Sequence, residues 1–384
     1  MLELLFLLLP VAAAYGWFMG RNSVRSEERK EQQQFSKKYA AGLNLLLSDE
    51  PDKAVDLFVE LLDVDSDTLE THWTLGTLFR RRGEVERAIK IHQNLINRSN
   101  ITEYDRLNAM FELGKDYLSA GIYDRAEQMF SRLQNHKLFR TASRHYLLEL
   151  FQATHDWDKA IKVALRLNRD DHIEAVVGQL YCELSLTEQS VSKQIKYCKK
   201  ALKYDKRCVR ASILLGQIYA GRDQLREAIH SYEYVLEQDK QFIRDVLQPL
   251  KACYMSLQDE AGYIEFLNRC VAANAGTSAV IELSEYLFEN QGGDAAERFI
   301  RSAMEQHATM RGFHQLMDFH IRAADVGNAR ESLRMLQKMV AEHIKQRPSY
   351  ACRQCGFSGQ TLYWQCPSCK TWGSTKPIKG LDGE

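Results

Sequence analysis

The chain has 384 residues, enough for two or three ordinary domains, yet it holds only six prolines and no Gly/Ser-rich linker before its C-terminal region, which favours one long repetitive body. Its 51 Lys and Arg residues balance 51 Asp and Glu residues. Because no overall basic field is available to hold a phosphate backbone, we expect no nucleic-acid partner.

An apolar segment begins the chain. From Leu4 to Met19 no residue is charged, and Arg21 and Arg25 follow at once. Residues 1–20 supply roughly the ~20 residues that a spanning helix needs, so we predict a transmembrane anchor at 1–20 and a juxtamembrane linker at 21–34. A cleavable signal peptide, cut near Ala12–Ala14, is the alternative, but such a peptide carries its positive charge before the apolar run.

The basic residues behind this segment predict its orientation. Short basic flanks stay on the cytoplasmic side of a membrane, and Arg21, Arg25, Arg29 and Lys30 all follow the apolar run. We therefore expect a single-pass membrane protein with its N-terminus outside and residues 21–384 in the cytosol.

Residues 35–346 have helical periodicity and no credible alternating strand run, so this region is predicted to be all-α. The pattern Leu-Gly-x-x-aromatic occurs at 75–79, 113–117 and 215–219. At fixed distances from each glycine follow an alanine, a large residue and an aliphatic residue: Ala88, His92 and Leu95; Ala126, Phe130 and Leu133; Ala228, Tyr232 and Val235.

This order of small, large and apolar positions resembles the tetratricopeptide repeat, whose period is ~34 residues. A small residue is needed where the two antiparallel helices of a unit touch closely, and the large residue fills the space where the next unit stacks. Weaker copies in the same register bring the total to about nine: Gly42/Ala54/Phe58, Leu148/Phe151/Ala160, Gly178/Tyr181/Ala201, Tyr254/Leu267, Leu287/Ala296/Ile300 and Ala329/Leu333/Leu336. We predict a superhelical solenoid; an irregular helical domain is the alternative.

Stacked helix pairs form a concave face that is lined by the first helix of each unit and suits the binding of a peptide or protein. By register, seven side chains are expected to face this groove as candidate partner-binding residues: Trp73, Thr77, Arg80, Arg81, Arg210, Ile213 and Gln217. The triplet Arg80-Arg81-Arg82 is a candidate clamp for an acidic segment. A solvated face is the alternative.

Nine cysteines fall into two groups. Five are scattered singly, which suits a reducing cytosol better than a disulfide framework, and we interpret them as small buried hydrophobes rather than nucleophiles. These five are Cys182, Cys198, Cys208, Cys253 and Cys270.

The other four cysteines form two Cys-x2-Cys pairs with ten residues between them: Cys352, Cys355, Cys366 and Cys369. Each pair makes a tight turn that aims two thiolates at one point, and two such turns complete a tetrahedral shell. We predict a four-cysteine metal ribbon at 347–375 and a polar tail at 376–384. Chance pairs or a disulfide are the alternative.

Four thiolates leave no open coordination position, so the ion should be structural or electron-carrying. Zinc is the chemical default, whereas the spacing resembles a shortened rubredoxin pair and so implies iron; Lys370 stands where rubredoxin has a second glycine. Tyr363, Trp364 and Trp372 can cover a site too small to have its own core, and metal binding should supply the folding energy. The expected cofactor is one metal ion, iron or zinc.

Common catalytic motifs are missing from the sequence. No Gly-x4-Gly-Lys-Ser/Thr loop, His-Glu-x2-His helix or Gly-x-Ser-x-Gly elbow occurs, so no catalytic residue is nominated and we expect the protein not to be an enzyme.

The order of an N-terminal anchor, about nine repeats and a Cys-x2-Cys-Gly-Phe…Cys-Pro-x-Cys ribbon closely resembles the lipopolysaccharide assembly protein B family of Gram-negative bacteria, over essentially the whole chain. The resemblance implies an inner-membrane adaptor, with a periplasmic N-terminus, that promotes proteolysis of the lipid A pathway deacetylase by the membrane AAA+ protease FtsH. It also implies that the four paired cysteines are metal ligands.

Two other functions stay open: an assembly scaffold that gathers lipopolysaccharide-synthesis enzymes without a role in proteolysis, and an iron-ribbon electron carrier. The expected partners are FtsH, the deacetylase, other lipopolysaccharide-synthesis or inner-membrane proteins and, through the N-terminal helix, the lipid bilayer. A homo-oligomer also stays open. We further expect the ribbon to pack as a docking plate against the last repeats.

Overall fold

The computed structural model describes residues 69–99, 101–167, 171–324 and 327–384, together with isolated positions before residue 69. It divides the chain into two compact units, residues 1–150 and 151–384. Most of the predicted anchor, the whole linker and most of the first repeat lie outside the described residues. Within the described part of the chain, no helix combines the length and the apolar character that crossing a bilayer requires.

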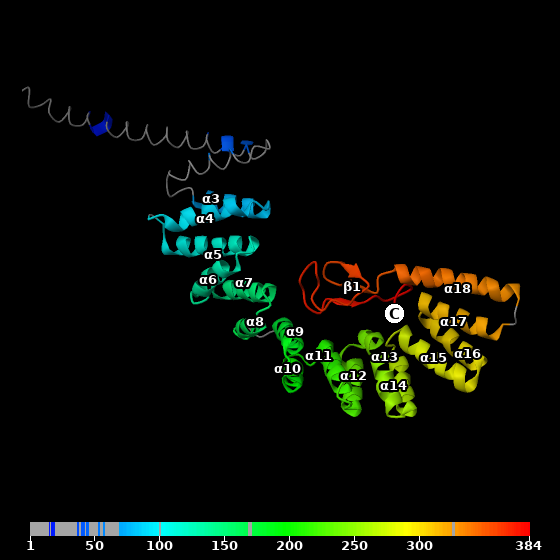
Figure 1. Ribbon diagram of the computed structural model, residues 1–384. Helices are drawn as coiled ribbons and strands as arrows, with labels where there is room; N and C mark the ends of the chain where they lie inside the picture. Colours follow the sequence, from blue (N-terminus) through cyan, green and yellow to red (C-terminus); the bar gives the residue numbers. More distant parts are fainter. Residues whose placement is uncertain are drawn as a thin grey trace, which may run out of the picture. The chain divides into compact units, whose positions relative to one another are not determined.

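In the first unit, antiparallel helices follow one another along the chain (Figure 1): α3 (Leu69–Arg81), α4 (Val85–Asn97), α5 (Glu103–Ser119), α6 (Tyr123–Leu133) and α7 (Arg140–Ala153), whose last residues enter the second unit. Tight turns separate the paired helices. Gly83 and Gly121, with φ of 83° and 73°, occupy the left-handed region at two of these turns, as glycine can without steric cost.

The second unit continues the helical pairs and ends in a small sheet (Figure 1). Its helices are α8 (Trp157–Ala164), α9 (Asp171–Thr187), α10 (Val191–Tyr204), α11 (Val209–Ala220), α12 (Leu225–Asp239), the 3-10 turn η3 (Lys240–Phe242), α13 (Ile243–Ser256), α14 (Glu260–Ala272), α15 (Thr277–Gln291), α16 (Gly293–Gln306), α17 (Met310–Ala323) and α18 (Asn328–Gln346).

The predicted small residue at the close contact of two paired helices is confirmed, and the large residue of the second helix also meets it there. A Cβ added to Gly76 would lie 2.5 Å from the His92 ring, one on Gly114 would lie 2.8 Å from Phe130, and one on Gly216 would lie 2.5 Å from Tyr232. Each large ring is fully or almost fully buried. The glycine therefore lets the two helices of a unit approach until the ring of the second helix fills the contact.

Replacing Gly216 with alanine is expected to lower the free energy of unfolding by about 1–3 kcal/mol, because an extra methyl group would overpack a filled core. Urea denaturation measures the loss. Gly221→Ala is the matched control, since its Cβ would make only an ordinary 3.4 Å contact with the Gln217 carbonyl oxygen. Equal losses for the two variants would contradict this account of the repeat.

Three short strands form the C-terminal ribbon: β1 (Tyr350–Cys352), β2 (Ser358–Gly359) and β3 (Thr375–Pro377). The order is β2-β1-β3, and both pairings are antiparallel, with Tyr350 opposite Gly359 and Pro377. The predicted ribbon boundary at 375 is therefore corrected. Strand β3 extends past it, and the residues that follow are no free polar tail, because their backbone and side chains bind the ribbon and the last repeats, as described below.

Candidate metal centre and its contact with the helical repeats

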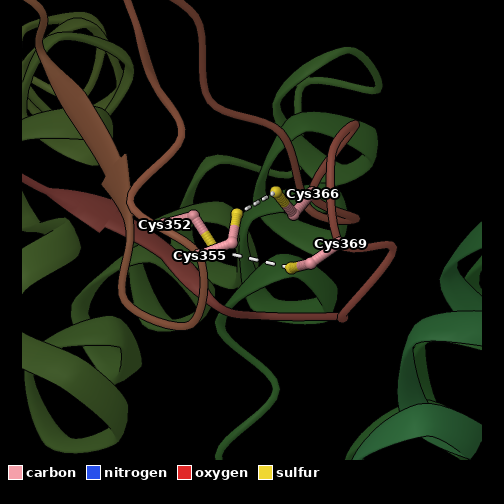
Figure 2. A group of neighbouring side chains, drawn as sticks. All are labelled: Cys352, Cys355, Cys366 and Cys369. Carbon is pink, nitrogen blue, oxygen red and sulfur yellow. Dashed lines mark hydrogen bonds between the residues drawn. The ribbon is translucent and has the colours of Figure 1, made fainter.

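The four paired cysteines turn their sulfurs toward one point (Figure 2). Cys352 Sγ lies 3.7 Å from Cys369 Sγ, Cys355 Sγ lies 3.6 Å from Cys366 Sγ, and all four sulfurs lie within 4.8 Å of one another. A tetrahedral ion with metal–sulfur bonds of about 2.3 Å has sulfur–sulfur edges of about 3.8 Å. The shell therefore fits one tetrahedral metal ion, and both zinc and iron accept four thiolates.

Short hydrogen bonds close the two turns that carry these sulfurs. The Gly356 N–H donates to the Cys352 carbonyl at 3.0 Å, and the Lys370 N–H donates to the Cys366 carbonyl at 2.9 Å. Around Cys352 Sγ, the Gln354 N–H lies at 3.4 Å and the Ser374 hydroxyl oxygen at 3.2 Å. Burial opposes ionisation of this thiol, but the hydroxyl and nearby backbone N–H groups outweigh it and lower the pKa of Cys352 to about 6, which favours the thiolate that a metal needs.

The second turn uses a residue other than glycine in a left-handed conformation. Gly356 follows the first pair with φ of 79°, and Lys370 follows the second pair with φ of 58°. Lys370 thus takes the backbone conformation of the glycine that rubredoxin has there, at a steric cost of roughly 1–2 kcal/mol. The substitution leaves the geometry of the metal shell intact.

Lys370→Gly is expected to stabilise the metal-loaded ribbon by about 1 kcal/mol, because glycine adopts a positive φ without the Cβ penalty. Thermal unfolding followed by tryptophan fluorescence reports the change through Trp364 and Trp372. Gly356→Lys should shift the unfolding midpoint in the opposite direction. A destabilised Lys370→Gly variant would mean that the lysine side chain itself supports the turn.

The ribbon lies against the first helices of successive repeats, on the inner side of the curve that α9 to α17 form (Figure 1). One equivalent position in each of these repeats takes part in the contact. Arg210, Asp245, Ser278 and Arg311 stand in the first turns of α11, α13, α15 and α17, 33 to 35 residues apart. Because these four residues recur with the period of the repeat, their side chains form a row that faces residues 350–384.

Two tryptophans of the ribbon hold Arg210. Its guanidinium carbon lies 5.9 Å from the ring centroids of both Trp364 and Trp372, and Arg210 Nη1 lies 2.8 Å from Glu183 Oε1. Trp364 also stacks on Phe242 with a centroid distance of 5.4 Å. Trp372 Nε1 donates to Gln152 Oε1 at 2.6 Å. The aromatic residues predicted to cover the metal site thus also join it to the repeats.

The last residues tie the ribbon to α13, α15 and α17. The Glu384 carboxylate accepts hydrogen bonds from the Ser278 backbone N–H at 2.9 Å and the Ser278 hydroxyl at 2.7 Å, and it pairs with Arg311. Tyr350 donates its hydroxyl proton to Asp245. The Glu384 side chain is only 5% exposed, so this segment is part of the folded unit. The expected docking of the ribbon against the last repeats is present, and sequence reasoning missed the role of residues 376–384 in it.

Two predicted groove residues are engaged within the chain and not free for a partner. Arg80 donates to Asp116 Oδ1 at 2.7 Å and to Glu112 Oε2 at 2.8 Å, and it is largely buried. Asp116 in turn accepts from His92 Nδ1 at 2.5 Å. The proposed clamp is therefore corrected, since the charge of Arg80 is neutralised by the next repeat. The prediction that Arg210 faces an open groove is also wrong, because the ribbon covers this side chain.

The remaining groove candidates lie at more accessible positions. Arg81 and Gln217 are exposed, while Trp73, Thr77 and Ile213 are half-buried. Ile213 packs against the core formed by α11 to α15. Their role in binding a partner stays a prediction.

The five scattered cysteines are all buried, as expected. Burial raises the pKa of the Cys198 thiol to about 11 and that of Cys270 to about 12. Both thiols are therefore protonated near neutral pH and are poor nucleophiles.

Paired helices around glycine contacts and a four-thiolate ribbon define the class: a tetratricopeptide-repeat protein with a rubredoxin-like metal-binding domain. The rubredoxin metal binding domain family matches residues 350–377. Lipopolysaccharide assembly protein B of Escherichia coli (strain K12) is 44% identical over 100% of both chains, and that of Haemophilus influenzae is 37% identical over 100% of both chains. The chain belongs to the lipopolysaccharide assembly protein B family.

Among solved structures, the chain is similar in fold to one of Naa15/Naa10 bound to HypK-THB, with a TM-score of 0.53 and 13% sequence identity. The similarity covers 83% of this chain and 48% of that one. At that identity it supports the helical-repeat fold alone.

Proposed function

We propose that this protein is a non-catalytic adaptor in lipopolysaccharide assembly, held at the inner membrane by residues 1–20 with its repeats in the cytosol. It promotes proteolysis of the lipid A pathway deacetylase by FtsH. The observation that carries the proposal is the full-length similarity to lipopolysaccharide assembly protein B, and the repeats supply surfaces of a kind that binds proteins.

In this adaptor the repeats that the ribbon covers and the repeats that it leaves open have different roles. It covers the first turns of α11, α13, α15 and α17, so client binding falls to first helices that it does not cover. In α3, the exposed Arg81 and the half-buried Trp73 and Thr77 are the residues we assign to that role. Anchoring raises the effective concentration of a bound client beside a membrane protease.

The test is the half-life of the deacetylase in cells with and without this protein. Loss of the protein should lengthen the half-life, and so should deletion of residues 1–20 if the truncated chain keeps its helical signal. An unchanged half-life would instead favour a scaffold that gathers lipopolysaccharide-synthesis enzymes. A fully active chain without residues 1–20 would refute the role of the anchor.

The identity of the metal is tested separately. Metal analysis combined with visible absorption separates a colourless zinc ribbon, which is structural, from a coloured iron ribbon. Only reversible reduction of a coloured site would support electron transfer as the function.

A further inference from the structure

The last helix of the repeats, α18, has an apolar face that no other described residue of the chain covers. Met335, Leu336 and Met339 are 66%, 54% and 64% exposed, and no residue of α18 is fully buried. The three side chains lie on one face because residues three and four apart are neighbours on a helix. On the other side lie half-buried Leu333 and Val340, and between them Gln337 donates to Asp318 of α17 at 3.1 Å.

A comparison with the equivalent positions of other repeats indicates which kind of element would cover this face. Leu336 occupies the position that Leu95 has in α4, Val235 in α12 and Cys270 in α14, and those three residues are 0% exposed. In each of those cases the first helix of the following repeat packs against the helix that carries the residue. After α18 the chain turns into the ribbon instead (Figure 1). The element that would pack against this face of α18, and that the described residues do not supply, is therefore a helix.

The charges beside the apolar face indicate which charged residues the partner helix should carry. Arg334 and Lys338 flank the middle of the face and make no ion pair among the described residues, while Glu331 and Glu342 stand beyond its two ends. A helix that packs here gains from carboxylates opposite Arg334 and Lys338. A second copy of α18, laid antiparallel, would place Arg334 and Lys338 against the same basic pair, which disfavours self-association.

We propose that the face formed by Met335, Leu336 and Met339 docks an amphipathic helix of a partner protein, with acidic residues flanking its apolar stripe, in the place that the first helix of a tenth repeat would take. This surface is distinct from the ribbon and from the groove residues of α3. It gives the protein a second protein-binding site, whichever client the groove holds.

The experiment places a photo-cross-linking amino acid at Met339 of the full-length chain in cells, with position Arg222, an exposed residue of the α11–α12 turn, as the control. Mass spectrometry of the cross-linked peptide then identifies the segment seated on α18. We expect an acidic amphipathic helix of another protein, captured at position 339 and not at 222. A cross-link to a second copy of this chain, or none at position 339, would overturn the proposal.

Binding of the identified segment as a synthetic peptide provides the second measurement. The double variant Arg334→Glu/Lys338→Glu should weaken its binding to the purified protein at least tenfold, and so should Leu336→Ser. All three side chains are exposed, so the thermal melting curve should not change. Unchanged peptide binding in the charge-reversed variant would also overturn the proposal.

Discussion

Replacing Cys352 with serine should abolish metal binding and unfold residues 350–377 while the helices persist. The ribbon has strands of only two or three residues and few buried side chains, so it has too little core to fold without a metal. In zinc-finger peptides the ion contributes about 10–16 kcal/mol of apparent binding free energy at pH 7. Metal analysis should fall from one ion per chain to near zero, with a red shift of tryptophan fluorescence and a retained helical signal at 222 nm.

Cys253→Ala is the matched control for this experiment. Cys253 is also buried, but it lies in α13, away from the metal shell. This variant should keep one ion per chain, although it loses some core packing. If the Cys352→Ser protein kept its ion and a protected ribbon, the four-sulfur shell would not be what holds residues 350–377 together.

Arg210→Ala should loosen the contact of the ribbon with the repeats while leaving the metal in place. The substitution removes a charge that is 8% exposed and leaves Glu183 without its partner, and loss of one member of a buried pair costs roughly 3–5 kcal/mol. Contact with two tryptophan rings adds about 0.5–2 kcal/mol. Discounting for the partial exposure of Glu183, we expect a loss of about 3 kcal/mol, which corresponds to a ~100-fold faster exchange of ribbon amides through local opening.

Hydrogen–deuterium exchange over Trp364–Trp372, together with metal analysis, measures this effect. Arg222→Ala is the control, because Arg222 is an exposed arginine at the other end of α11. Arg210→Lys should fall between the wild type and alanine, since lysine keeps the charge but loses the planar group that lies against both rings. Exchange as slow as in the wild type would show that the tail and Tyr350 suffice to hold the ribbon.

Together these two variants separate metal binding from docking. The first removes both, and the second weakens docking alone. If the half-life of the deacetylase responds to Cys352→Ser and not to Arg210→Ala, the folded ribbon acts by itself. If it responds to both, the ribbon acts through its place on the repeats.

Features that depend on residues close together in the chain could be predicted from the amino-acid sequence. The spacing of Gly76 and Gly216 within a helical pair predicted that the two helices touch closely there, although not that His92 and Tyr232 would fill the contact. The two Cys-x2-Cys pairs are local turns, and their spacing alone predicted the metal shell. Burial of the five scattered cysteines was predicted from their single, unpaired spacing and is confirmed.

Which side chains stay accessible to a partner depends instead on contacts between segments that are far apart in the chain. Arg210 meets Trp364 and Glu384 meets Ser278 across more than 100 residues of chain, because the repeats curve around the ribbon. Arg80 meets Asp116 only once α3 and α5 stack. No local pattern encodes these contacts, since they depend on how successive repeats pack. For the same reason, the sequence predicted the ninth repeat and its Leu336 but not that the described part of the chain would leave the outer face of α18 exposed.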